Sequence, residues 1–329
     1  MTPEEVIIRT QEILKENKKD WQKRYFNYMA KAVSNTPLVL QKRQLFHKWG
    51  NLNVYCPLGN VIDNKNWFDL RYLGQSVGYI CVNEGVVSLH ISEDQYKNNC
   101  NEKYFIGYPK DICRPTNRQK GDETGVGYLW QSSVEAKEFR KYFKSKPEKH
   151  GHVEHRFENN LLNEFWKRYS DKSLCGIQPV TIGESDLFFQ LPTPLKASTT
   201  EIAYANRKGG GIDILARRNN VLTVFELKDE YKSSEGPEKV ICQAVAYATF
   251  IVELCNTEAR DIFWEFCGFH GKTHGNETIN VSILMPDPGN GSQPCFTNKI
   301  LSVPGSDMKL KLHTTYFDKD NMIITWSSL

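Results

Sequence analysis

Two carboxylates and a lysine stand close together in the C-terminal half of the chain. Glu226 and Lys228 are two positions apart in a β-like run, so both side chains project from the same face of a strand. Asp213 lies near the start of the preceding β-like run, and a hairpin of the two runs can bring it beside Glu226. Adjacent carboxylates repel unless a proton or a cation lies between them, and hard oxygen ligands favour Mg²⁺, with Mn²⁺ as a substitute. Because such a metal lowers the pKa of bound water and Lys228 can orient that water, the pattern predicts phosphodiester hydrolysis.

These three residues resemble the motif of the PD-(D/E)xK nuclease superfamily, the fold of many restriction and repair endonucleases. The resemblance covers about residues 150–290 and says nothing of the first half. It implies that Asp213 and Glu226 bind Mg²⁺ and that Lys228 serves the attacking water. One departure is that Ile212 stands where the family signature has proline, and apolar replacements are common there.

The same resemblance implies further site residues on two helices. Gln243 and Tyr247 match a Gln and a Tyr that many members carry one turn apart on the helix after the motif, where Gln243 would support the site. A glutamate on the first core helix often completes the metal site. Glu154 fits that position best, as a third metal ligand, and Glu158 is the second choice.

Hydrophobic spacing predicts the elements that position these residues. Thr2 fits a helix N-cap and Pro3 the first helical position, and the predicted first helix ends at Ser34–Pro37. Strands are predicted over 68–73, 79–82 and 86–91, the last two joined by a hairpin turn, and a helix over 133–143. The second half predicts a helix over 152–169, strands over 211–216 and 221–228, a helix over 237–254, a strand over 279–285 and a last hairpin within 314–326.

This order of elements predicts an α/β (α+β) protein with two domains. We expect a mixed α+β accessory domain over residues 1–147, for binding nucleic acid or a partner. A restriction-endonuclease-like domain with an αβββαβ core is expected over residues 148–329.

Composition indicates the cellular compartment in which the chain is expected. It contains no apolar run long enough for a membrane-spanning helix, and its acidic start, with Glu4 and Glu5, is unlike a signal peptide. Nine scattered cysteines without CxxC spacing predict free thiols in a reducing cytoplasm. We therefore expect a cytoplasmic protein without a membrane partner, and the sequence leaves the oligomeric state open, a dimer included.

Charge is distributed unevenly, which favours a nucleic-acid partner. Residues 1–150 carry a formal charge of +7 and residues 151–329 a charge of −4. Basic residues interleaved with Trp and Tyr suit phosphate contacts and base stacking; they include Lys18, Lys19, Lys23, Arg24, Lys42, Arg43 and the 114–120 segment. A protein-binding or purely structural role for this half remains an alternative.

Competing motifs are weaker. Gly74–Gly78 matches the GxSxG pattern of serine hydrolases, but a strand rather than a helix is predicted after it, so we interpret its glycines as turn or bulge residues. Histidines near 150–155 and 270–274 lack cysteines at zinc-finger spacing. Lys208–Gly211 lacks the P-loop ending, and we interpret it as a flexible lead into the Asp213 strand.

The hypothesis drawn from the sequence is a Mg²⁺-dependent nuclease that hydrolyses DNA, an endonuclease rather than an exonuclease. The alternative is a catalytically inactive protein that keeps the nuclease fold as a nucleic-acid-binding or assembly module.

Overall fold

A capped helix opens the chain, as the sequence predicts. In the computed structural model, Thr2 Oγ1 accepts a hydrogen bond from the backbone N–H of Glu5 at 3.2 Å, and the Glu5 carboxylate accepts one from the Thr2 N–H at 2.7 Å. This reciprocal capping box satisfies two of the donors that a helix start leaves open. The structure describes residues 1–47, 49, 51–116, 127–145, 153–168, 176–198, 201–206, 209–218, 221–228, 237–269, 278–289 and 296–329, the side chains of 153–155 and 168 excepted.

The predicted first helix is two helices, α1 (Pro3–Glu16) and α2 (Lys18–Arg43), and the prediction that it stops at Ser34–Pro37 is wrong. Helix α2 continues through Pro37 although proline lacks the N–H of a helical hydrogen bond. Long-range packing explains the continuation. Val39 is fully buried, and the Asn35 side chain donates to the carbonyl of Ile62 at 2.9 Å.

The chain forms two compact units, each discontinuous in sequence. Unit 1 comprises Met1–Val33, Asn160–Val180 and Gln190–Leu329, and unit 2 comprises Ser34–Asn159 and Thr181–Phe189. This division differs from a single boundary between residues 147 and 148. The reason is that α1 packs on a helix of the C-terminal half, whereas residues 187–188 add a strand to the sheet of unit 2.

Unit 1 is built on one mixed sheet. Its strand order is β15-β16-β14-β13-β12-β6, with β17 paired to β16. Strands β13, β14 and β16 run parallel, and the other pairs are antiparallel. These strands are β6 (Gln178–Pro179), β12 (Ile214–Arg218), β13 (Val221–Leu227), β14 (Thr278–Pro286), β15 (Thr297–Ser302), β16 (Lys309–Phe317) and β17 (Ile324–Ser327).

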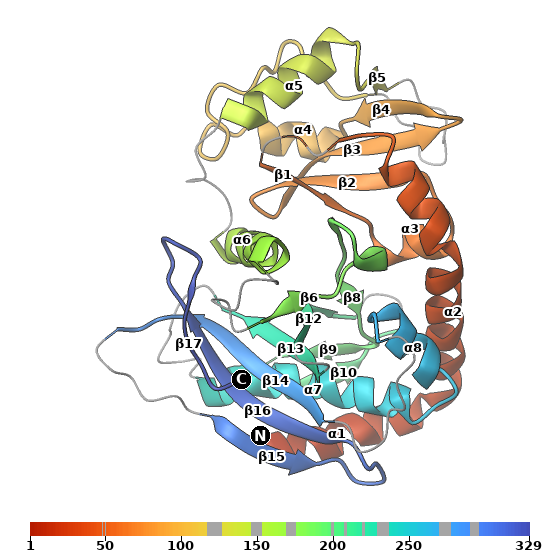
Figure 1. Ribbon diagram of the computed structural model, residues 1–329, viewed down its shortest axis with the longest axis vertical. Coiled ribbons are helices and arrows are strands. Elements are labelled where there is room, and N and C mark those ends of the chain that lie inside the picture. The colour runs from red at the N-terminus through yellow and green to blue at the C-terminus, as the bar shows by residue number, and fades with distance from the viewer. Residues whose placement is uncertain are drawn as a thin grey trace. The chain divides into compact units, whose positions relative to one another are not determined.

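Two helices lie on opposite faces of this sheet. Helix α7 (Pro237–Cys255) packs against β13, β14 and β16 (Figure 1). Phe165 of α6 (Val153–Arg168) contacts Phe225 of β13, with ring centres 6.1 Å apart. The neighbouring Glu226 lies near Tyr247 of α7. Because successive strand residues point to opposite faces, α6 and α7 cover different faces.

Smaller elements complete unit 1. Two short two-stranded sheets pair β8 with β11 and β9 with β10. The bounds are β8 (Leu191–Pro192), β9 (Leu195–Ala197), β10 (Ile202–Tyr204), β11 (Gly211–Ile212) and α8 (Arg260–Phe266).

Unit 2 has its own sheet, in the order β5-β4-β3-β2-β1-β7, with helices α4 and α5 over one face (Figure 1). Phe139 of α5 would touch a Cβ placed on Gly78 of β3, so this face is closely packed. The elements are β1 (Leu52–Tyr55), α3 (Leu58–Ile62), β2 (Trp67–Tyr72), β3 (Gln75–Asn83), β4 (Val86–His90), α4 (Glu93–Asn99), β5 (Tyr128–Leu129), α5 (Val134–Ser145), a 3₁₀ turn at Ile182–Glu184 and β7 (Leu187–Phe188).

The α+β class is therefore confirmed, as are the strand predicted over 68–73, the hairpin of β3 and β4, helix α7, strand β14 and the C-terminal hairpin of β16 and β17. The GxSxG segment begins at the β2–β3 turn and runs into strand β3, as expected for turn glycines. Of the nine cysteines, the seven that the structure describes form no disulfide.

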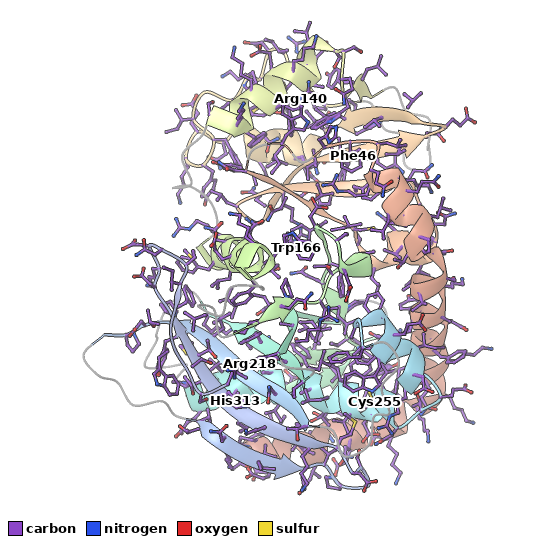
Figure 2. All side chains as sticks on the ribbon, in the orientation of Figure 1. Phe46, Arg140, Trp166, Arg218, Cys255 and His313 are labelled. Atoms are coloured by element: carbon purple, nitrogen blue, oxygen red, sulfur yellow. The ribbon has the colours of Figure 1, made fainter. Side chains whose placement is uncertain are left out.

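A buried polar chain crosses the sheet of unit 1 on the α6 face. His313 Nδ1 lies 2.9 Å from the carbonyl oxygen of Ser328, and its Nε2 lies 3.1 Å from Asn280 Oδ1. The pKa of His313 is lowered to about 4, mainly by burial and also by the positive charges of Lys311 and Arg218, while the hydrogen bond with the Ser328 backbone acts in the opposite direction (Figure 2). The folded protein therefore holds this imidazole neutral.

We predict an acid-dependent loss of stability from His313. Its pKa is lower in the folded chain than the ordinary 6.5, so between pH 6.5 and 4 the unfolded chain binds the extra proton. The free energy of unfolding should fall with decreasing pH in that window, by up to about 1.4 kcal/mol per pH unit from this group. Urea unfolding at several pH values should show this slope reduced in His313→Asn but kept in His47→Asn, which alters an exposed histidine. Equal slopes in wild type and His313→Asn would contradict the assignment.

Candidate active site

The β12–β13 hairpin brings Asp213 and Glu226 together. Ile214 pairs with Phe225, and one step further along an antiparallel pair places Asp213 opposite Glu226. Asp213 lies at a break in the strand, between β11 and β12, and its Oδ2 accepts a hydrogen bond from the Leu227 N–H at 3.0 Å. The carboxylate is thus held against the end of β13.

Glu226 and Lys228 form an ion pair on this end of β13. Lys228 Nζ donates to Glu226 Oε1 at 3.0 Å, and the two side chains are 21% and 2% exposed. The backbone N–H of Lys228 donates to the Leu284 carbonyl at 3.0 Å, which continues the pairing with β14. Solvent therefore reaches the lysine and the half-buried Asp213, whereas Glu226 is covered.

Helix α7 adds Gln243 and Tyr247 to the same place. The pKa of the Tyr247 phenol is raised to about 12, mainly by burial and also by the negative charges of Glu226 and Asp213. Hydrogen bonds with the Gln243 side chain and the Ala197 backbone act in the opposite direction. The phenol is therefore protonated at neutral pH and available as a hydrogen-bond donor, not as a base.

The glycine tract before Asp213 packs tightly rather than forming a flexible lead. Gly210 donates its N–H to the Leu195 carbonyl at 2.6 Å and accepts from the Thr193 N–H at 2.8 Å. A Cβ on Gly209 would meet the Thr193 carbonyl oxygen, and one on Gly210 would meet the Tyr247 hydroxyl. Lys208 lies outside the described residues.

Sequence reasoning missed the segment that receives this tract, residues 191–197 in β8 and β9. The signal for it was the run of three glycines, Gly209–Gly211. Glycines are typical where one backbone must approach another closely.

The structure does not describe the side chain of the predicted third metal ligand, Glu154. Glu154 belongs to helix α6, but its side chain lies outside the described residues. The second choice, Glu158, is 4% exposed and belongs to unit 2, whereas Asp213 and Glu226 belong to unit 1. There its negative charge raises the pKa of the buried Tyr55, after burial itself.

The described residues supply some of the oxygen ligands that a hard cation such as Mg²⁺ needs. Among the side chains described, no group of three or more His, Cys, Asp or Glu is placed to hold a metal. Asp213 and Glu226 supply two carboxylates, each with two oxygens that can accept hydrogen bonds or bind a cation. Mg²⁺ is commonly held by one or two carboxylates with water in its other positions, so these two residues fit it.

The predicted basic residues divide into two groups. Lys42 and Arg43 have partners within unit 2, Asn64 and Asp186, and Arg24 pairs with Asp20 at 3.6 Å. By contrast, a cavity of about 620 Å³ in unit 1 has a basic wall formed by Lys18, Lys19 and Lys23. The histidine side chains at 150–155 and 270–274 lie outside the described residues.

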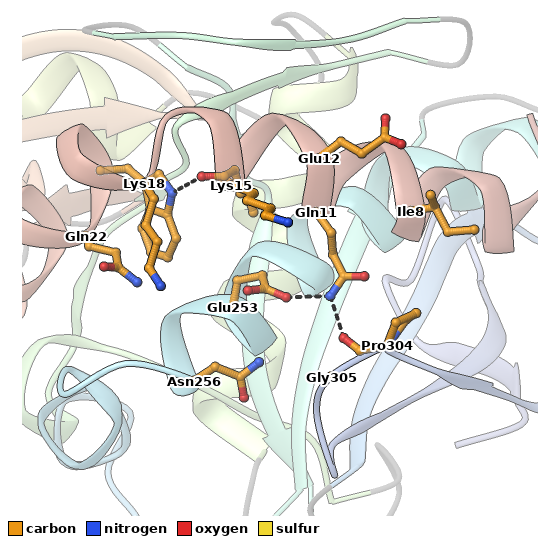
Figure 3. A pocket seen from close by; sticks show the side chains of 12 residues that line it. Ile8, Gln11, Glu12, Lys15, Lys18, Gln22, Glu253, Asn256, Pro304 and Gly305 are labelled. Atoms are coloured by element: carbon orange, nitrogen blue, oxygen red, sulfur yellow. Dashed lines mark hydrogen bonds between the residues drawn. The ribbon is translucent and has the colours of Figure 1, made fainter.

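A second cavity of unit 1, of about 530 Å³, lies beside α1 and the C-terminal part of α7 (Figure 3). Gln11 bridges its sides, donating to Glu253 Oε1 at 2.6 Å and to the Pro304 carbonyl at 2.8 Å. Lys15 and Lys18 also line it. This cavity is separate from the residues around Asp213.

Comparisons with models of known protein families, with curated proteins and with solved structures found no match. Within the part of the chain that the structure describes, no helix is long and apolar enough to cross a bilayer. The chemistry of the site therefore rests on its own geometry.

We predict that Gly210 is restricted to glycine by Tyr247. Gly210→Ala should lower the free energy of unfolding by about 1–3 kcal/mol, because the added methyl group would meet the phenol oxygen. Adding Tyr247→Phe should recover part of that loss, because the oxygen is gone. Gly211→Ala is the matched control, since its Cβ would lie 3.7 Å from the Leu191 carbonyl oxygen, an ordinary contact. Losses that simply add in the double variant, measured by urea unfolding, would argue against this contact.

Proposed function

We propose that this protein is a metal-dependent nuclease that hydrolyses DNA phosphodiester bonds, as an endonuclease. The observation that carries the proposal is the convergence of Asp213, Glu226 and Lys228 at one end of the β12–β13 hairpin, beside Gln243 and Tyr247. Carboxylates and an amine at the edge of a sheet are the groups that hydrolysis of a phosphodiester requires.

The order of elements supports the same proposal. Helix α6 precedes β6, β12 and β13, which form an antiparallel meander in the sheet, and α7 then leads to β14, parallel to β13. This order resembles the αβββαβ order of the restriction-endonuclease-like core, which supports the proposal. Asp213 directly precedes β12, Glu226 lies on β13, Lys228 directly follows β13 and Gln243 lies on α7.

Each residue has a defined role in the proposed reaction. Asp213 and Glu226, with Glu154 as the proposed third ligand, would hold Mg²⁺ or Mn²⁺. When bound, the metal supplies Lewis acidity and lowers the pKa of a water molecule. Lys228, the more exposed partner of its ion pair, would position that water. Gln243, which forms a hydrogen bond with Tyr247, would support the site.

The proposed nuclease function also implies a nucleic-acid partner and a cellular location. Lys18, Lys19 and Lys23 on one cavity wall would attract the phosphate backbone. The seven described free cysteines agree with the reducing cytoplasm that we propose as the protein's location.

One observation favours the alternative, an inactive nuclease fold that binds nucleic acid or a partner. Both carboxylates already have protein partners, Asp213 the Leu227 N–H and Glu226 the Lys228 amine. In that alternative the cluster stabilises the hairpin and binds no metal, so metal binding and cleavage separate the two functions.

We predict that Lys228→Ala slows DNA cleavage in Mg²⁺ by about a hundredfold or more, the scale for loss of a positioned acid–base group. DNA affinity should change far less, because phosphate contacts elsewhere supply most of it. Cleavage rate and affinity should be measured side by side, with Lys309→Ala as the control for an exposed lysine of the same sheet. Equal cleavage by wild type and Lys228→Ala would rule out this role.

We predict that Asp213→Asn weakens Mn²⁺ binding by about tenfold or more, because it removes one ligand charge from the site. The asparagine oxygen can still accept from Leu227, so the unfolding transition should change little. Titration calorimetry with Mn²⁺ checks the first point and thermal unfolding the second. If wild type itself binds no Mn²⁺ at this site and does not cleave, the inactive alternative holds.

A further inference from the structure

A buried arginine in unit 2 lies against two tryptophan rings. The guanidinium carbon of Arg140, on helix α5, is 4.8 Å from the ring centre of Trp49 and 4.7 Å from that of Trp130 (Figure 2 labels Arg140). Arg140 is 7% exposed and Trp130 1%. Both distances are those of cation–π contacts, which attract the guanidinium but do not use up its N–H donors.

The charge of Arg140 has no anionic partner among the described residues. Two other arginines of this unit with little exposure are compensated: Arg43 pairs with Asp186 at 2.6 Å and Arg71 with Asp69 at 2.8 Å. Arg140 donates one N–H to the backbone carbonyl of Trp130. Burial lowers the pKa of its guanidinium, with no nearby carboxylate to oppose that effect.

Both stacking rings also carry donors without an acceptor. The indole nitrogens of Trp49 and Trp130 are buried, and no acceptor for either is found among the described residues. Each nitrogen belongs to a ring centred within 5 Å of the guanidinium carbon, so both lie in the surroundings of that charge. Buried donors are rarely left unpaired in folded proteins, so two indole donors without an acceptor beside a buried cation without an anion indicate a missing ligand.

We propose that Arg140, Trp49 and Trp130 form a binding site for an oxyanion of the phosphate class. A negative charge would offset the buried cation, and several oxygens are needed to accept from three separate groups. Phosphate has enough oxygens for all three, whereas a carboxylate has two. Trp49 is half-buried, so the ligand can approach from its side. The proposal is independent of the hydrolysis assigned to Asp213.

The test measures binding of inorganic phosphate to the full chain, by titration calorimetry and by tryptophan fluorescence. Wild type should bind saturably in the millimolar range or tighter. Trp49→Phe and Trp130→Phe keep an aromatic ring against the arginine and remove one N–H each, so each should weaken binding by about tenfold. Trp264→Phe, which alters a buried tryptophan packed on Phe263 and Phe269 in unit 1, should bind as wild type does.

Arg140→Lys extends the test, because it keeps the charge and loses the planar fork, and weaker binding is expected. If that variant does not fold, the two Phe variants still decide the matter. A 5′-phosphorylated dinucleotide that binds better than its 5′-hydroxyl form identifies a nucleic-acid phosphate as the source, and binding of inorganic phosphate alone identifies a free anion. No saturable binding to wild type, or equal binding by wild type and both Phe variants, would overturn the proposal. Asp213→Asn should leave phosphate binding unchanged, so loss of cleavage and loss of this site are distinguishable.

Discussion

The antiparallel pairing of β12 with β13 is the contact on which the candidate active site depends. Its register places Asp213 opposite Glu226, and the bond from the Leu227 N–H holds the aspartate at the strand break. A slip of one residue would turn Glu226 to the face that α6 covers. The pairing therefore fixes both which carboxylates meet and that they meet on the α7 side, near Tyr247.

Buried charges are stabilised in two ways in this protein, by ion pairs and by aromatic rings. Glu226 is covered but lies against Lys228, and Arg43 lies against Asp186. A buried ion pair gains little net stability, because desolvation offsets the attraction, but loss of one partner leaves an expensive charge. Arg140 departs from this pattern, since aromatic faces replace the carboxylate among the residues that contact it. Aromatic faces supply attraction but no formal negative charge, which is why that position is suited to an anion.

Local sequence patterns predicted most helices and strands around the site. The features that these patterns missed depend on contacts between residues far apart in the sequence. Runs of apolar residues were sufficient to predict β13 and α7, because both elements are almost wholly buried. The passage of α2 through Pro37 depends on packing of Val39, which no local pattern reveals. Glu154 and Glu158 share one helix face, so spacing could not separate them. The negative charge of Glu158 acts on the buried Tyr55, a relation that no local pattern reveals.

The glycine tract shows how a segment interpreted as a linker shapes the site. Tyr247 lies near both carboxylates and against the backbone of Gly210, and the tract can come this close because it has no Cβ atoms. The tract is in turn held by Thr193 and Leu195. The phenol is thus confined by the backbone as well as by Gln243, and its burial keeps it protonated. A confined, neutral donor next to two carboxylates limits where their oxygens can point, and so limits where a cation could be bound.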